Sequence, residues 1–118
     1  NFSAVSSACL AIRSEVFDEV SGFYAENLPN GLFDADLCLR IGEKGYRIVW
    51  TPHAECVQIV DSATEKAVSR NSPETVYFKR RYEKILKNDL FYNPNLSLDD
   101  ENFSVAIPPR FEKVWRKS

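Results

Sequence analysis

The chain has 118 residues, of which 44% are hydrophobic and 13% aromatic, and its net charge at pH 7 is −2. These are the values of a globular domain, and the near-neutral charge gives no reason to expect a nucleic-acid partner. The length predicts one domain, or part of one, with a real hydrophobic core. We expect no membrane span, because no apolar run approaches roughly 20 residues, and no signal peptide. The absence of an initial Met predicts a piece of a longer protein.

The first predicted elements are a strand and a short helix. Small and apolar residues from Phe2 to Ile12 predict a buried strand. Ser14 is expected to cap the helix, which Ser21-Gly22 ends. Val16, Phe17 and Val20 would then share one apolar face, and Phe23 would turn inward.

Two carboxylates, Asp34 and Asp36, stand where a loop turns into a helix that Gly45 ends. We expect Asp34 at the N-cap and Asp36 in the first turn, where side-chain oxygens accept from free backbone N–H groups. Asp36 and Arg40 are spaced for an i,i+4 ion pair. The buried stripe would consist of Leu37, Cys38 and Ile41. Both carboxylates can be simple caps; alternatively, Asp34 is the freer one and acts on a ligand.

The next segments predict two strands, Tyr46–Thr51 and Ala54–Val60, with His53 on the turn between them. A lone histidine on a turn is more often solvated than catalytic. The polar stretch from Asp61 to Asn71 predicts a loop.

A helix is expected from Pro73 to Lys87, preceded by Ser72. Its apolar stripe would contain Phe78, Tyr82, Ile85 and Leu86. The opposite face is basic, with Lys79, Arg80, Arg81, Lys84 and Lys87. It is either a solvated face or a contact for an anionic ligand or membrane surface. The turn-rich segment 88–97 carries aromatics expected to pack back onto the body, and residues 108–118 would form a tail.

The three cysteines, Cys9, Cys38 and Cys56, are odd in number, lie in apolar contexts and show no C-x-x-C spacing. We therefore expect three buried thiols in a reducing compartment. A metal cluster built from them is not expected.

Four segments, taken together and in order, closely resemble the C-terminal half of family 2 glycosyltransferases. They are Val5–Arg13, Val16–Phe23, Phe33–Arg40 and Gly45–Glu55. The later segment 88–97 resembles the tail of bacterial rhamnosyltransferases of the O-antigen type.

This resemblance implies an α/β fold, namely the C-terminal part of a GT-A fold with a mixed sheet and flanking helices. Residues 1–118 would be a single partial domain on the acceptor side. The nucleotide-binding half, with its Asp-x-Asp metal motif, would lie upstream of residue 1. The 118 residues alone are therefore expected to transfer no sugar.

In the family, the first Asp of the D-x-D-L-C-L-R run is the general base, so the resemblance assigns this role to Asp34. It would take a proton from the acceptor hydroxyl as that oxygen attacks the anomeric carbon with inversion. This role requires a carboxylate that faces an open cleft rather than its own backbone amides. Gly22, Phe23, Asp36 and Arg40 would support the acceptor side.

Two positions depart from the family pattern. Phe33 stands where the family often has Glu or Asn, and Gln58 or Ile59 stands where it often has a metal-binding histidine. Gln58 is a weak ligand for a hard cation, so Mg²⁺ or Mn²⁺ would be held mainly by the upstream half. These departures favour an alternative, a non-catalytic module of the same scaffold that binds carbohydrate or protein.

The partners implied by the resemblance are a nucleotide-sugar donor and a glycan or lipid-linked acceptor in surface polysaccharide synthesis. The expected location is the cytoplasm, with peripheral contact at the inner face of the membrane.

Overall fold

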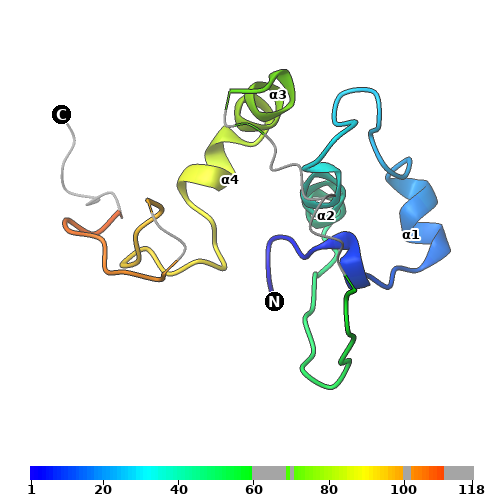
Figure 1. The fold of residues 1–118 in the computed structure, drawn as a ribbon, viewed down its shortest axis with the longest axis horizontal. Helices are drawn as coiled ribbons and strands as arrows, with labels where there is room; N and C mark the ends of the chain where they lie inside the picture. The colour runs from blue at the N-terminus through cyan, green and yellow to red at the C-terminus, as the bar shows by residue number, and fades with distance from the viewer. Residues whose placement is uncertain (60–68, 70, 100–101, 111–118) are drawn as a thin grey trace. The chain divides into compact units, whose positions relative to one another are not determined.

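The computed structural model describes residues 1–59, 69, 71–99 and 102–110 (Figure 1). The chain divides into two compact units, Asn1–Tyr82 and Glu83–Ser118. The first contains a 3₁₀-helix, η1 (Ser7–Cys9), and three α-helices, α1 (Ser14–Glu19), α2 (Phe33–Glu43) and α3 (Pro73–Arg81). The second contains α4 (Glu83–Lys87). The expectation of a single partial domain remains a prediction.

The core of the first unit is built by α1 and α2. Val16 and Val20 pack against Leu37 and Ile41, and all four side chains are buried. Partly buried apolar residues from neighbouring segments complete this cluster: Leu10, Ile12, Phe17 and Ile48. Burial of each large apolar side chain stabilises the fold by about 1.5–3 kcal/mol. The predicted stripe of Leu37, Cys38 and Ile41 is confirmed.

Helix α2 begins differently from the prediction. Its N-cap is Leu32, in the left-handed conformation with a φ of 61°, and no side chain caps the helix there. The prediction that Asp34 is the N-cap is therefore wrong, because Asp34 already lies in the first helical turn. Asp36 lies in that turn as expected.

The end of α2 follows the prediction. Gly45 has a φ of 87° and donates its N–H to the Gly42 carbonyl at 2.9 Å. Tyr46 donates to the Ile41 carbonyl at 3.3 Å. This pair of hydrogen bonds is a Schellman motif, in which a left-handed glycine lets the chain leave the helix.

Of the predicted starts of α1 and α3, only that of α3 is confirmed. Ser72 accepts a hydrogen bond from the Thr75 N–H at 3.2 Å, with Pro73 in the first turn, so the predicted start of α3 is confirmed. In α1 the N-cap position belongs to Arg13, and Ser14 lies inside the helix. The helix predicted to continue to Lys87 is interrupted at Tyr82, so it forms two short helices.

No strand forms within the described residues. The described residues contain two isolated antiparallel bridges, one between Phe2 and Ile48 and one between Leu96 and Val105. The predicted strand from Phe2 to Ile12 is wrong, because this segment contains η1. The strand predicted over Tyr46–Thr51 is also absent. The strand predicted over Ala54–Val60 is absent from its described part, where the Val57 and Ile59 side chains are 92% and 95% exposed. Apolar and β-branched residues favour an extended backbone, but a strand also needs a partner. The GT-A sheet itself remains a prediction.

The second unit is organised around Arg110. Its guanidinium donates to the carbonyls of Leu96 at 2.6 Å, Asn93 at 3.2 Å and Lys87 at 3.4 Å. It also lies 5.3 Å from the centre of the Tyr92 ring. One guanidinium thus holds several turns together through its fixed fork of donors. The sequence around Arg110 carries no pattern that predicts this role.

Three glycines offer a graded test of the backbone. Gly22 has a φ of 62°, and an added Cβ would lie 3.0 Å from the Phe17 ring. We expect Gly22→Ala to lower the free energy of unfolding by more than about 2 kcal/mol, because strain and crowding add. Gly45→Ala, in open space, should cost about 1–2 kcal/mol, whereas Gly42→Ala should stabilise the helix by up to about 1 kcal/mol. Urea denaturation of the three variants checks this order, and equal effects at Gly22 and Gly45 would contradict it.

Candidate functional site

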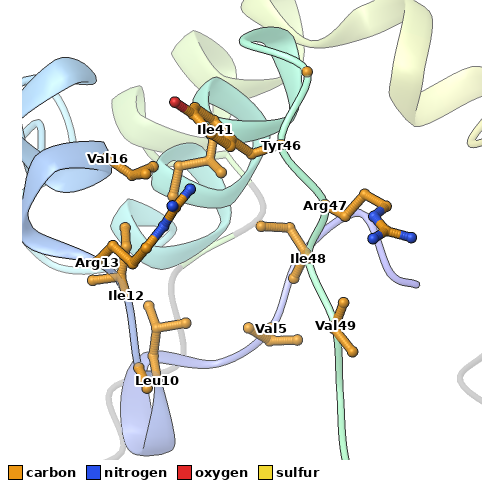
Figure 2. A pocket seen from close by; sticks show the side chains of 12 residues that line it. Val5, Leu10, Ile12, Arg13, Val16, Ile41, Tyr46, Arg47, Ile48 and Val49 are labelled. Carbon is orange, nitrogen blue, oxygen red and sulfur yellow. The ribbon is translucent and has the colours of Figure 1, made fainter.

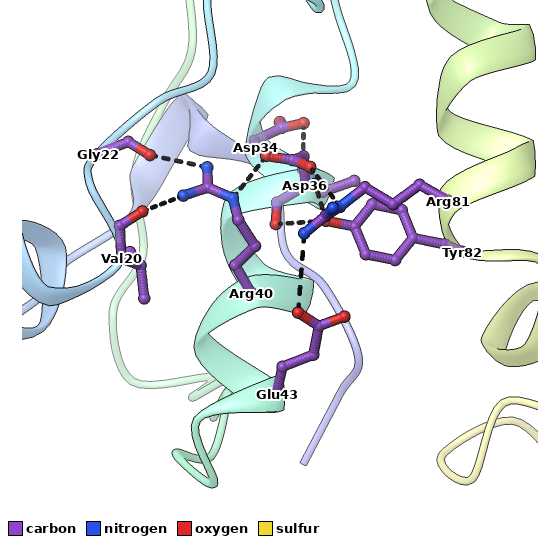
Figure 3. A network of polar contacts seen from close by, with 9 residues as sticks. Val20, Gly22, Asp34, Asp36, Arg40, Glu43, Arg81 and Tyr82 are labelled. Carbon is purple, nitrogen blue, oxygen red and sulfur yellow. Dashed lines mark hydrogen bonds and ion pairs between the residues drawn. The ribbon is translucent and has the colours of Figure 1, made fainter.

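A buried ion pair lies at the centre of the candidate site. The Asp36 side chain is almost fully buried, and its Oδ2 accepts a hydrogen bond from Arg40 Nε at 2.8 Å (Figure 3). The predicted i,i+4 pair is therefore confirmed. Asp36 Oδ1 accepts a second hydrogen bond, of 2.6 Å, from the Tyr82 hydroxyl. Both carboxylate oxygens thus have donors, which is the condition under which a buried charge is tolerated.

Arg40 connects this pair to the end of α1. Its guanidinium donates to the Val20 carbonyl and, at 2.7 Å, to the Gly22 carbonyl (Figure 3). Its charged group lies 5.2 Å from the centre of the Tyr24 ring. Carbonyls at a helix end have no partner within the helix, so a cation there is favourable. The predicted supporting residues Gly22, Asp36 and Arg40 are therefore in one network.

Phe23 lies outside this network. The centre of its ring lies 5.5 Å from the centre of the Phe17 ring and 5.4 Å from the centre of the Phe33 ring, and both contacts are edge-on. The side chain is 44% exposed, so the expectation that Phe23 turns inward is wrong. The pairing of aromatic rings explains its position, because edge-on stacking stabilises rings that are only partly buried.

Two residues of the site, Arg81 and Tyr82, were not expected there. Arg81 donates from Nε to the Tyr82 hydroxyl at 3.0 Å, and its guanidinium lies 4.0 Å from Asp36 Oδ1 and 3.9 Å from Glu43. Burial, and then the hydrogen bond to Asp36, raise the pKa of Tyr82 well above its usual value. The sequence did carry a signal for Tyr82. It is a tyrosine within a predicted apolar stripe, and a buried tyrosine hydroxyl needs a hydrogen-bond partner.

A second carboxylate holds the loop that leads into α2. Glu74, buried in the first turn of α3, accepts from the Asn30 side-chain amide at 2.6 Å and from the Asn30 N–H at 3.3 Å. The loop before α2 is thus fastened to α3. Among the described residues the other Glu74 oxygen has no hydrogen-bond partner.

Asp34 is half-buried and faces η1. Its Oδ2 accepts from the Ser7 N–H at 3.0 Å and from the Ser7 hydroxyl at 3.3 Å, and its Oδ1 accepts from the Ala35 N–H at 2.8 Å. A carboxylate has about four acceptor positions, so three are occupied by protein donors. The carboxylate expected to face open space is instead largely engaged by the chain itself.

A cavity of about 450 Å³ lies elsewhere in the first unit (Figure 2). Its walls are mainly aliphatic and include Leu10, Ile12, Val16 and Ile48. Arg13 and Arg47 also line it, and its lining includes no carboxylate from the described residues. This cavity therefore suits apolar groups and does not contain Asp34.

The residue considered for metal binding, Gln58, is exposed. His53 and Gln58 both lie in the exposed segment 51–59. Within the described part of the chain no group of three or more His, Cys, Asp or Glu side chains could hold a metal ion. The donors present there do not fit a divalent cation. The loop predicted from Asp61 to Asn71 lies mostly outside the described residues, as do residues 111–118 of the tail predicted from 108 to 118.

The cysteines differ from the prediction of three buried thiols. Cys38 is buried, and burial raises the pKa of its thiol. Cys9 and Cys56 are exposed, so the prediction is wrong for these two. Cys9 ends η1 and Cys56 lies in an irregular segment, both at the surface, where an apolar sequence context does not ensure burial. Among the helices described, none has the length and apolar character needed to cross a membrane.

The Tyr82 hydroxyl gives a test of the buried network. We expect Tyr82→Phe to lower the free energy of unfolding by about 1.5–3 kcal/mol, because Asp36 Oδ1 loses its closest donor. Tyr46→Phe is the matched control, since the Tyr46 hydroxyl also donates to a carboxylate, Glu19, but at the exposed surface. That variant should change stability little. Equal losses in urea denaturation would contradict a special role of the buried hydroxyl.

Two curated proteins match the chain, whereas no family model and no solved structure matches it. It is 38% identical over 113 residues to the uncharacterized protein y4gI of Sinorhizobium fredii, covering 92% of this chain and 12% of that protein. It is 34% identical over 102 residues to the O-antigen biosynthesis protein RfbC of Myxococcus xanthus, covering 83% of this chain and 8% of that protein. The chain thus spans about a tenth of the length of these curated relatives. It is similar to one part of a protein named for O-antigen biosynthesis.

Proposed function

We propose that this chain is the acceptor-side part of an inverting glycosyltransferase that acts in surface polysaccharide synthesis. The donor would be a nucleotide sugar, and the acceptor a glycan or lipid-linked glycan at the inner face of the membrane. Two observations support the proposal: the similarity to an O-antigen biosynthesis protein, and the resemblance of four ordered segments to family 2 glycosyltransferases.

The observation that carries the proposal is the similarity to a protein named for O-antigen biosynthesis. Within the chain, the proposed base Asp34 lies in the first turn of α2. The buried network of Asp36, Arg40 and Tyr82 fixes α2, and Ser7 holds the Asp34 carboxylate from η1. A general base needs such a fixed position, because proton transfer depends on hydrogen-bond geometry to the substrate.

In the proposed reaction, the remaining acceptor position of Asp34 receives the proton of the acceptor hydroxyl. The oxygen forms a bond to the anomeric carbon as the bond to the nucleoside diphosphate breaks, so the leaving group takes the electron pair and the configuration inverts. Binding of the donor is assigned to residues outside these 118. The divalent cation implied by the family resemblance, Mg²⁺ or Mn²⁺, would be held mainly by residues outside these 118, since no group of three or more His, Cys, Asp or Glu side chains among the described residues could hold one.

A second candidate is a non-catalytic module that binds carbohydrate or protein. The hydrogen bonds from Ser7 and Ala35 favour it, because they occupy most of the acceptor positions of Asp34. Phe33 favours it as well, because an apolar ring stands where a polar neighbour would orient the base.

The test is a transfer assay with the full-length protein, a panel of radiolabelled nucleotide sugars and a bacterial lipid-linked glycan fraction. We expect one donor to label the acceptor, with an inverted linkage in the product by NMR. The 118 residues alone should give no product. Glycan binding by the full-length protein without transfer from any donor would instead support the non-catalytic module.

A further inference from the structure

Two exposed thiols lie side by side in the first unit although they are far apart in the sequence. Cys9 is the last residue of η1, and Cys56 lies in the exposed segment 51–59, 47 positions further along the chain. Their sulfur atoms are 3.3 Å apart. Such a distance is a close contact between two thiols, about 1.3 Å longer than a disulfide bond.

We propose that Cys9 and Cys56 form a reversible disulfide, a modification site that tethers η1 to segment 51–59. The required movement is small, and Cys56 lies in a segment without helix or strand hydrogen bonds that would resist it. Both thiols are exposed, so a small oxidant reaches them. Cys38 does not compete, because it is buried and donates its S–H to the Val5 carbonyl.

The oxidant class is a small disulfide such as glutathione disulfide. The thiolate of one cysteine attacks a sulfur of glutathione disulfide, which forms a mixed disulfide and releases one glutathione thiolate. The second cysteine, after loss of its proton, attacks the protein sulfur of the mixed disulfide and releases the second glutathione. Two protein thiols are thus oxidised to one disulfide, while one glutathione disulfide is reduced to two glutathione molecules.

The tether has a local consequence at Asp34. Ser7, two residues before Cys9, supplies the backbone N–H and the hydroxyl that bind the Asp34 carboxylate. A covalent link at the end of η1 therefore limits the movement of the group that holds Asp34. This inference does not depend on sugar transfer.

The linkage is tested by peptide mapping of the full-length protein after equilibration with glutathione and glutathione disulfide. Trypsin cleaves after Arg13, Arg40, Arg47 and Lys66, so the three cysteines leave in three different peptides. We expect one linked pair that joins the Cys9 and Cys56 peptides and is lost in excess dithiothreitol. Separate glutathione adducts on these two cysteines, or linkage to Cys38, would overturn the proposal.

Thermal unfolding and hydrogen exchange test the tether. The oxidised protein should unfold on the order of 10 °C higher than the reduced protein, because the link closes a long loop of the unfolded chain. The difference should vanish in Cys56→Ser and persist in Cys38→Ala. The Ser7 amide should also exchange more slowly after oxidation. Equal melting temperatures and equal Ser7 exchange in both redox states would show that no tether forms.

Discussion

Asp34→Asn is expected to lower the kcat of sugar transfer by the full-length protein at least about 100-fold, with donor binding nearly unchanged. General-base catalysis by a positioned group typically contributes a factor of about 10² to 10⁴. An asparagine amide has a similar shape but cannot accept a proton at neutral pH. Steady-state kinetics with the donor and acceptor from the transfer assay would measure kcat, and calorimetry with the nucleotide sugar would measure donor affinity.

The control has to separate loss of the base from loss of structure. An asparagine offers a single acceptor oxygen to the Ser7 and Ala35 donors, so Asp34→Asn should also cost about 1–2 kcal/mol of stability. Asp18→Asn, at an exposed position in α1, is the matched substitution and should retain full activity. Undiminished turnover in a folded Asp34→Asn protein would remove Asp34 from the mechanism.

Arg40→Met should lower the free energy of unfolding by about 3–5 kcal/mol. The variant leaves the Asp36 carboxylate buried without its cation, and it also removes the donors to the Val20 and Gly22 carbonyls. Breaking a buried pair by removal of one partner carries a cost of this size. Urea denaturation of the full-length protein, followed by fluorescence, would measure it.

Two further variants make this result specific. Lys44→Met removes an ion pair with Glu19 whose side chains are 51% and 41% exposed, and it should cost at most about 1 kcal/mol. The double variant Asp36→Leu with Arg40→Met should be more stable than Arg40→Met alone, because no unpaired charge remains. If Arg40→Met costs no more than Lys44→Met, the buried network does not hold α2 in place.

Local signals predicted which segments contain helices and part of their ends, but not the N-caps of α1 and α2 or the break at Tyr82. The Ser72-Pro73 start, the Gly45 stop and the spacing of Asp36 and Arg40 depend on neighbours within one or two turns, so they were readable from sequence. The N-cap of α2 was missed because Leu32, which has no capping side chain, adopts the left-handed conformation there. A residue of that type gives no capping signal.

The contacts between residues far apart in the sequence could not be predicted from it. Asp34 is bound by Ser7, which lies 27 residues earlier in the chain. Asp36 is bound by Tyr82, which lies 46 residues later. The contact between Cys9 and Cys56 likewise joins segments that are distant in the sequence. The apolar sequence around each of these cysteines predicted a buried thiol, whereas both are exposed.

The sequence by itself determined the amphipathic helices, the i,i+4 pair of Asp36 and Arg40, and the family resemblance that singled out Asp34. These depend on the 3.6-residue period and on residue types at short spacing. Only the tertiary structure decided that Asp34 is bound by Ser7, that Tyr82 completes the Asp36 network and that two surface thiols meet. The physical reason is that a polar side chain in a fold takes its partners from whichever segment packs beside it, and packing is a property of the whole chain.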